Sequence, residues 1–250
     1  MRGLVQCGTL ALFATLAPVA PLTSQSTTQL VSTGSVVYPY SRTLTFVGEA
    51  SPAVLIDGSP DFWEIGVDGG VEYTLTPSID LLAYQFFILN NQIGGLNSFE
   101  FRTRLGVIPH WRPRSRWLIQ GRVIVETRFI FYEGDTPNDG SARLRIRGLT
   151  RYTVHKHSEY TKGAIFLRGD IEAFTPIGPK AEERYFDKFG LRFGVGSRLR
   201  QDIVAEIDLV RRASEFTLGD NSDNVDWLIE LRFTYVLPRR DEGFTKIQSN

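Results

Sequence analysis

Residues 225–235 read VDWLIELRFTY, and their alternation decides the fold. Apolar side chains occupy every second position from Val225 to Tyr235, while Asp226, Glu230 and Arg232 lie on the other parity. Successive side chains of a strand point to opposite faces, so this strand has one apolar and one charged face. It is about twice as long as a common globular strand of 5 or 6 residues. A tilted strand crosses a bilayer in about 9 to 11 residues, so the segment predicts a membrane-spanning strand.

The same period of two recurs along most of the chain. Alternating segments are expected at residues 62–75, 99–107, 117–131, 143–154, 165–173, 188–195 and 203–212. The segment from Ile79 to Leu89 is apolar on both faces, and we interpret it as a strand as well. No long stretch has a helical period.

The connections between these segments alternate in length. Short or moderate links, such as Thr76 to Ser78 and Leu199 to Gln201, alternate with longer polar ones, such as Asn90 to Asn97. Outer-membrane barrels combine short periplasmic turns with long external loops and have an even number of strands. An upward strand at Arg42 to Val47 would bring the total to about ten. The sequence therefore predicts an all-β fold, an antiparallel up-and-down transmembrane β-barrel of about ten strands over residues 42–237.

Within a bilayer only closed strand pairing satisfies the backbone hydrogen bonds, so the strands are expected to form a closed barrel. The apolar parity is then expected to face lipid and the charged parity to face the lumen. Aromatic residues near the strand ends agree with this orientation. Trp63 and Trp227 would lie near the outer rim, and Trp111 and Trp117 near the inner rim. Aromatic girdles at both interfaces are typical of these barrels. Aromatic residues buried in an ordinary soluble core are the alternative.

The N-terminus has the pattern of an export signal. Arg2 precedes a short apolar run from Leu10 to Ala17, which is too short to span a bilayer. We predict a cleaved signal peptide at residues 1–24, a flexible uncharged lead-in at 25–41 and a polar C-terminal tail at 238–250. Cleavage removes Cys7, the only cysteine, and leaves a mature chain without a thiol nucleophile or a disulfide.

Composition excludes several functional classes. The 250 residues carry 28 Lys and Arg against 28 Asp and Glu, so the chain lacks the overall basic charge of a nucleic-acid-binding protein. The three histidines, His110, His155 and His157, map to the presumed periplasmic side. His155 and His157 share a strand face, but no third metal ligand is evident. Asp220, Asp223 and Asp226 lack the spacing of a calcium loop. We therefore predict no catalytic, cofactor-binding or metal-binding residue.

The charged parity instead predicts a structural network in the lumen. Paired carboxylates such as Asp170 and Glu172 could perform acid–base chemistry, but neighbouring strands offer arginines that would pair with them. The predicted lumen charge network comprises Arg102, Arg104, Arg122, Glu126, Arg128, Arg145, Arg147, Arg168, Asp170, Glu172, Arg192, Glu206, Asp208, Glu230 and Arg232. About ten strands enclose little free space, so these side chains would plug or narrow the pore.

The layout resembles the bacterial outer-membrane family known as domain-of-unknown-function family 2490. The resemblance rests on Asp61 to Glu64, Tyr84 to Phe87, Arg143 to Arg147, Tyr185 to Arg192 and Trp227 to Leu237, and covers most of the chain from Asp61 to Leu237. It implies an outer-membrane barrel and no activity or catalytic residue. The chain departs from typical barrels, which end on an aromatic residue, because a polar tail follows Leu237.

The expected protein is a non-enzymatic envelope component or a narrow conduit for small solutes, located in the bacterial outer membrane. Its expected partners are outer-membrane lipid and the barrel assembly machinery, with no nucleic acid and no cofactor, and a monomer is expected. Two alternatives remain open. One is a lipid-modifying outer-membrane enzyme, and the other is a soluble periplasmic lipocalin-like binder of an apolar ligand.

Overall fold

A computed structural model describes residues 26–56, 63–91, 97–134, 138–178, 186–215 and 223–239. Their regular structure is entirely β, in eleven strands: β1 (Ser26–Pro39), β2 (Leu44–Leu55), β3 (Trp63–Thr76), β4 (Ile79–Asn91), β5 (Ser98–Trp111), β6 (Trp117–Tyr132), β7 (Asp139–Thr153), β8 (Ile165–Ile177), β9 (Phe186–Arg198), β10 (Ile203–Glu215) and β11 (Asp223–Val236). Among these described residues there is no helix long and apolar enough to cross a membrane. The predicted signal peptide, residues 1–24, and most of the predicted polar tail, residues 238–250, lie outside the described residues.

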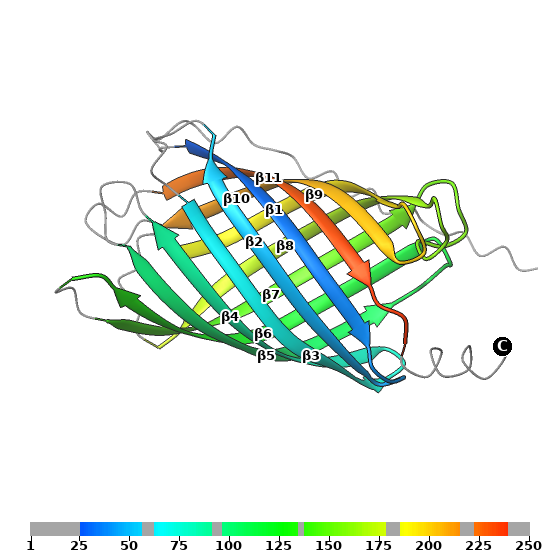
Figure 1. Cartoon of the computed structure of the whole chain (residues 1–250), viewed down its shortest axis with the longest axis horizontal. Coiled ribbons are helices and arrows are strands. Elements are labelled where there is room, and N and C mark those ends of the chain that lie inside the picture. Colours follow the sequence, from blue (N-terminus) through cyan, green and yellow to red (C-terminus); the bar gives the residue numbers. More distant parts are fainter. Residues whose placement is uncertain are drawn as a thin grey trace, which may run out of the picture.

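The strands close into a barrel (Figure 1). Strands β2 to β11 form an antiparallel meander in which each strand pairs with its neighbours in the sequence. Strand β1 lies between β2 and β11, and pairs antiparallel with β2 and parallel with β11. The parallel ladder is long, running from Ser26 opposite Val225 to Val37 opposite Val236. Every described strand therefore has a partner strand on both sides, and closure leaves no unpaired edge among them.

The expected all-β barrel is confirmed, but its strand number is eleven rather than about ten. The additional strand, β1, lies in the segment 25–41, for which the sequence predicts a flexible lead-in. That segment is rich in Thr and Val, which favour strands, but it has no charges to reveal two faces. A closed barrel needs an even number of strands only when every neighbouring pair is antiparallel. The parallel β1–β11 pair allows this barrel to close with an odd number of strands.

The two ends of the barrel differ in their connections. The turn end carries residues 40–43, 77–78, 112–116, 154–164 and 199–202, together with the end of β11. The loop end carries the remaining connections and the start of β1. The predicted alternation of short and longer links agrees with these positions, with one exception. The connection 154–164 lies at the turn end, yet it is longer than any connection of the loop end. Because the number of strands is odd, the barrel begins at one end and finishes at the other.

Apolar and charged residues are distributed in the reverse of an ordinary soluble core. Large apolar side chains on the outer face are exposed, for example Leu105 at 57% and Phe193 at 65%. Charged side chains on the inner face are buried, for example Glu126 at 0% and Asp208 at 1%. The predicted orientation of the two parities, with the apolar side chains outward and the charged ones in the lumen, therefore holds for the described strands.

Side chains fill much of the barrel interior. On β4, whose sequence is apolar on both faces, Leu82 packs inside with Ile108 and Ile124, and Tyr84 lies against them. On β9, the inward position 196 is glycine because the ring of Phe166 occupies the space beside it. A Cβ at Gly196 would lie 2.3 Å from Cζ of Phe166.

Candidate functional site: a charge network in the lumen

The candidate site is the network of arginines and carboxylates that β5 to β11 project into the lumen. Strand alternation positions it, because every second residue of each strand faces inward. Register then brings charges of opposite sign together across neighbouring strands, as with Arg104 opposite Glu126 and Arg147 opposite Glu172.

Two carboxylates organise the part of the network nearest β5. Glu100 accepts hydrogen bonds from Arg102, at 2.6 Å for Nη2, and from Arg128, at 3.2 Å for Nη2. Glu126 accepts from Arg104 and from Arg143, the latter at 2.6 Å. Each carboxylate therefore joins two guanidinium groups, which neutralises like charges that would otherwise repel each other.

An aromatic residue supports the next pair. Arg145 binds Glu172 through two nitrogens, and its Nη2 lies 3.1 Å from Oε2. The ring of Phe174 lies beneath Arg145, at 5.4 Å from Cζ to the ring centroid, and beneath Arg143, at 4.7 Å. Such cation–π contacts hold the guanidinium groups in place when few waters reach them.

Arg168 is the centre of the network. Its Nε donates to Asp170 at 3.0 Å and its Nη1 to Glu206 at 3.2 Å, while Asp208 lies 3.6 Å away. Asp170 also accepts from Arg147, whose Nη2 lies at 2.6 Å. The side chain of Arg168 is only 3% exposed, so its charge depends on these carboxylates for compensation.

The network reaches the closing strand through Glu230. Arg192 bridges Asp208, at 3.0 Å, and Glu230, and Arg232 also donates to Glu230 at 2.6 Å. The hydroxyl of Thr33 on β1 donates to the same carboxylate at 3.0 Å. Since Thr33 is buried, this hydrogen bond ties the uncharged β1 to the charged interior.

At the turn end, the connection 154–164 contributes a carboxylate to the same network. Glu159 is buried and accepts hydrogen bonds from Arg112 at 3.1 Å. It also lies 3.7 Å from Arg151, whose other partner is Glu206 inside the barrel. Arg198 donates to the backbone carbonyl of Glu159 at 2.8 Å. These contacts hold the connection against the barrel mouth.

Charge is distributed unevenly around the wall. Strands β1 to β4 carry five acidic residues and no Lys or Arg, and these acids are Glu49, Glu64, Asp68, Glu72 and Asp80. Two of these carboxylates accept hydrogen bonds from hydroxyl groups: Ser35 donates to Glu49 at 2.9 Å and Tyr84 donates to Glu72 at 2.8 Å. The arginine-rich wall begins at β5, so one side of the lumen is acidic and the adjoining side is basic.

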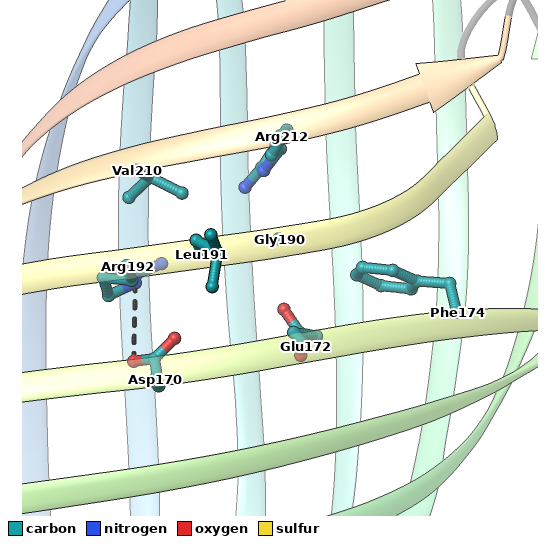
Figure 2. Close-up of a pocket in the computed structure, with 8 residues that line it drawn as sticks. All are labelled: Asp170, Glu172, Phe174, Gly190, Leu191, Arg192, Val210 and Arg212. Atoms are coloured by element: carbon teal, nitrogen blue, oxygen red, sulfur yellow. Dashed lines mark ion pairs between the residues drawn. The ribbon is translucent and has the colours of Figure 1, made fainter. Parts of the chain in front are cut away.

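A small cavity of about 10 Å³ lies within the network (Figure 2). Glu172 and Arg212 lie on either side of Gly190 in this view, and Arg192 is paired with Asp170 at 3.7 Å. A space of this size is about large enough for one water molecule and too small for an organic substrate. A larger hollow of about 370 Å³ lies beside Phe129, Gly140 and Ile177.

Most of the predicted lumen residues are brought together by these contacts. Arg122 is different, because it makes no ion pair with any described residue and lies opposite Arg147 in the register. The prediction missed Glu100, Arg143 and Arg151, although all three lie on the charged parity, which was the available signal. It also missed Glu159, which lies in a connection and therefore has no parity.

The histidines occupy the turn end. His110 lies 3.3 Å from Asp80, and its Nε2 lies 2.9 Å from the carbonyl of Pro77. His155 and His157 lie in the connection 154–164. Among the described residues, no three His, Cys, Asp or Glu side chains are grouped to hold a metal ion. Asp220 lies outside the described residues, while Asp223 and Asp226 belong to β11 rather than to a loop.

Chemically, the network is built for charge compensation. Both oxygens of Glu126, Glu206 and Glu230 accept hydrogen bonds from guanidinium groups. Oδ1 of the buried Asp208 has no hydrogen-bond partner among the described residues. No family model, curated protein or solved structure matches this chain. The resemblance to family 2490 therefore stays a prediction.

Proposed function

We propose that this chain is a non-enzymatic outer-membrane β-barrel protein, either an envelope component or a narrow conduit for small solutes. The observation that carries the proposal is the reversed distribution of residues, with exposed apolar side chains around the outside and paired charges inside. Water does not favour a continuous apolar belt of this kind, whereas hydrocarbon does.

The height of the belt supports a bilayer as the surroundings. On β6, exposed apolar side chains extend from Trp117 to Phe131. At roughly 3.3 Å per residue this is roughly 46 Å along the strand. A strand tilt of about 45° reduces it to roughly 33 Å, close to the hydrocarbon thickness of a membrane. Exposed tryptophans flank the belt, with Trp63 at the loop end and Trp111 at the turn end.

The filled lumen supports a structural protein or a narrow conduit over a wide channel. The central ion pairs around Arg168 and Glu126 are nearly inaccessible to solvent. A lipocalin-like carrier of an apolar ligand would need an apolar interior, which this charged lumen does not provide. A lipid-modifying enzyme at the outer surface would be favoured by a base at the loop end, whereas all three histidines lie at the turn end.

Membrane fractionation tests the proposal. The expressed protein should sediment with outer membranes, resist extraction by alkaline carbonate and migrate differently on gels before and after boiling. In planar bilayers it should give little or no current, because side chains occupy the lumen. A soluble periplasmic product that is insensitive to boiling would refute the proposal, and large steady currents would refute the filled lumen.

Two engineered cysteines test the orientation. The exposed Asn138 lies at the loop end and the exposed Arg42 lies at the turn end. Asn138→Cys should react with an impermeant maleimide on intact cells, whereas Arg42→Cys should react only after the outer membrane is permeabilised. The reverse result would place the loop end in the periplasm.

A further inference from the structure

The turn between β5 and β6 has features that the lumen network does not use. Residues 111–117 read WRPRSRW, with a tryptophan on each side of three arginines. Both tryptophans are exposed at the edge of the apolar belt, Trp111 at 63% and Trp117 at 38%. The ring of Trp117 lies against Tyr152 of β7, with 4.8 Å between the centroids. The aromatic boundary therefore continues onto the next strand.

The backbone of this turn is held in place. The amide of Trp117 donates to the carbonyl of Arg114 at 3.0 Å, and the amide of Thr153 donates to the carbonyl of Arg116 at 2.9 Å. Arg116 also donates to the carbonyl of Val154 at 3.4 Å. The arginines are thus presented by a fixed turn beside β7.

The three arginines have different surroundings. Arg112 is committed to Glu159 and to the ring of Tyr160, which lies 4.9 Å from its Cζ. Arg114 is exposed and Arg116 is half-buried, and neither forms an ion pair with a carboxylate of the described residues. Two guanidinium groups are therefore available just beyond the apolar belt, between two amphipathic tryptophan rings.

The charge around this turn is mainly positive. The turn end also carries Arg42, Lys156, Lys162 and Arg239, whereas two of its described acids are paired with arginines, Glu159 with Arg112 and Asp202 with Arg200. A third acid, Asp80, lies 3.3 Å from His110. Arginine binds phosphate oxygens through paired donors, and basic residues close to a membrane surface attract anionic lipids.

We propose that the turn 111–117 binds the phosphate of an anionic phospholipid in the leaflet at the turn end. Arg114 and Arg116 contact the phosphate, while Trp111 and Trp117 lie among the glycerol and upper acyl groups. This inference rests on the proposed membrane location. The phospholipid is favoured over free phosphate because the arginines directly adjoin the exposed apolar belt.

Tryptophan quenching by brominated lipids tests the site. The variant Trp63→Phe/Trp227→Phe keeps only the two tryptophans of the turn, since the chain has four in all. It is reconstituted in phosphatidylcholine containing phosphatidylglycerol, with either lipid brominated in turn. At low salt, brominated phosphatidylglycerol should quench more strongly than its share of the bilayer predicts. The preference should fall about fivefold for each arginine removed and should weaken at high salt.

Arg114→Gln/Arg116→Gln should remove this preference, and Arg200→Gln should keep it, because the exposed Arg200 at the same end is paired with Asp202 at 3.2 Å. The complementary variant Trp111→Phe/Trp117→Phe reports on the loop end and should show no preference. Equal quenching by both lipids, or an unchanged preference in the double glutamine variant, would overturn the site. Loss of the preference in millimolar inorganic phosphate would assign the site to free phosphate instead. Absence of quenching by either lipid would mean that the protein does not insert, which is failure of the proposed function.

Discussion

Two glycines on the inner face of β9 allow a matched test of lumen packing. A Cβ at Gly196 would lie 2.3 Å and 2.5 Å from two ring carbons of Phe166. At Gly190, six residues earlier on the same face, the nearest atom would be Cβ of Glu172 at 3.8 Å. Carbon atoms attract best at about 3.5–4.0 Å, so alanine fits at position 190 and overlaps by more than 1 Å at position 196.

The expected difference in stability follows from that overlap. Phe166 is 2% exposed and the guanidinium of Arg151 lies 5.1 Å from its ring, so the ring has little room to move. Overpacking of this kind costs about 1–3 kcal/mol. Replacing glycine by alanine also restricts the unfolded chain, which favours folding by about 0.4–1 kcal/mol. That gain is common to both variants and cancels in the comparison, because neither glycine has a positive φ.

The measurement is urea unfolding of Gly190→Ala and Gly196→Ala in lipid vesicles, followed by tryptophan fluorescence and by the boiling-dependent gel shift. Gly196→Ala should unfold with a free energy about 1–3 kcal/mol lower than Gly190→Ala. Adding Phe166→Leu to Gly196→Ala should restore part of the loss by freeing space. Equal stability of the two alanine variants would refute the close packing of the lumen at Phe166.

Three further predictions concern the outside, the interior and the closure of the barrel. Ile207→Arg, on the outer face, should lower the free energy of unfolding by about 2–4 kcal/mol if the side chain lies near the middle of a bilayer, as measured by urea unfolding in vesicles. If the side chain faced water, the free energy of unfolding would change by less than about 0.5 kcal/mol. Arg168→Met should lower the free energy of unfolding by about 3–5 kcal/mol in the same assay, because it leaves buried carboxylates uncompensated. The control Arg122→Met should lower it clearly less, and equal losses of stability would contradict the central place of Arg168. Ser32→Cys/Leu231→Cys should form a disulfide on mild oxidation, detected by gel mobility, because these residues are partners in the parallel β1–β11 ladder; failure to cross-link would argue against closure through β1.

Much of the fold could be predicted because charged residues mark the inner face of most strands. In β11, Glu230 and Arg232 identify one face as polar, and register then brings Arg192 of β9 to Glu230. The same signal was absent from β1, where Thr33 and Ser35 are the buried residues and neither carries a charge. A strand whose two faces are similar in polarity has no sequence period to detect.

The candidate site could be predicted by face but not by height along the strand. Arg122 and Glu126 are both on the inner face of β6, yet only Glu126 lies level with arginines of both neighbouring strands, Arg104 and Arg143. Parity fixes the direction of a side chain, while register depends on every turn around the barrel. The contribution of Glu159 depends on how a connection folds, which alternation does not describe.

The parallel β1–β11 ladder also constrains the biosynthesis of the barrel. This ladder joins residues about two hundred positions apart, so β1 has no partner on one side until β11 has been synthesised. A chain truncated before Asp223 would expose one edge on β1 and another on β10, and exposed edges invite aggregation. We therefore expect biogenesis to be all-or-none, with shortened products degraded rather than accumulated as smaller barrels.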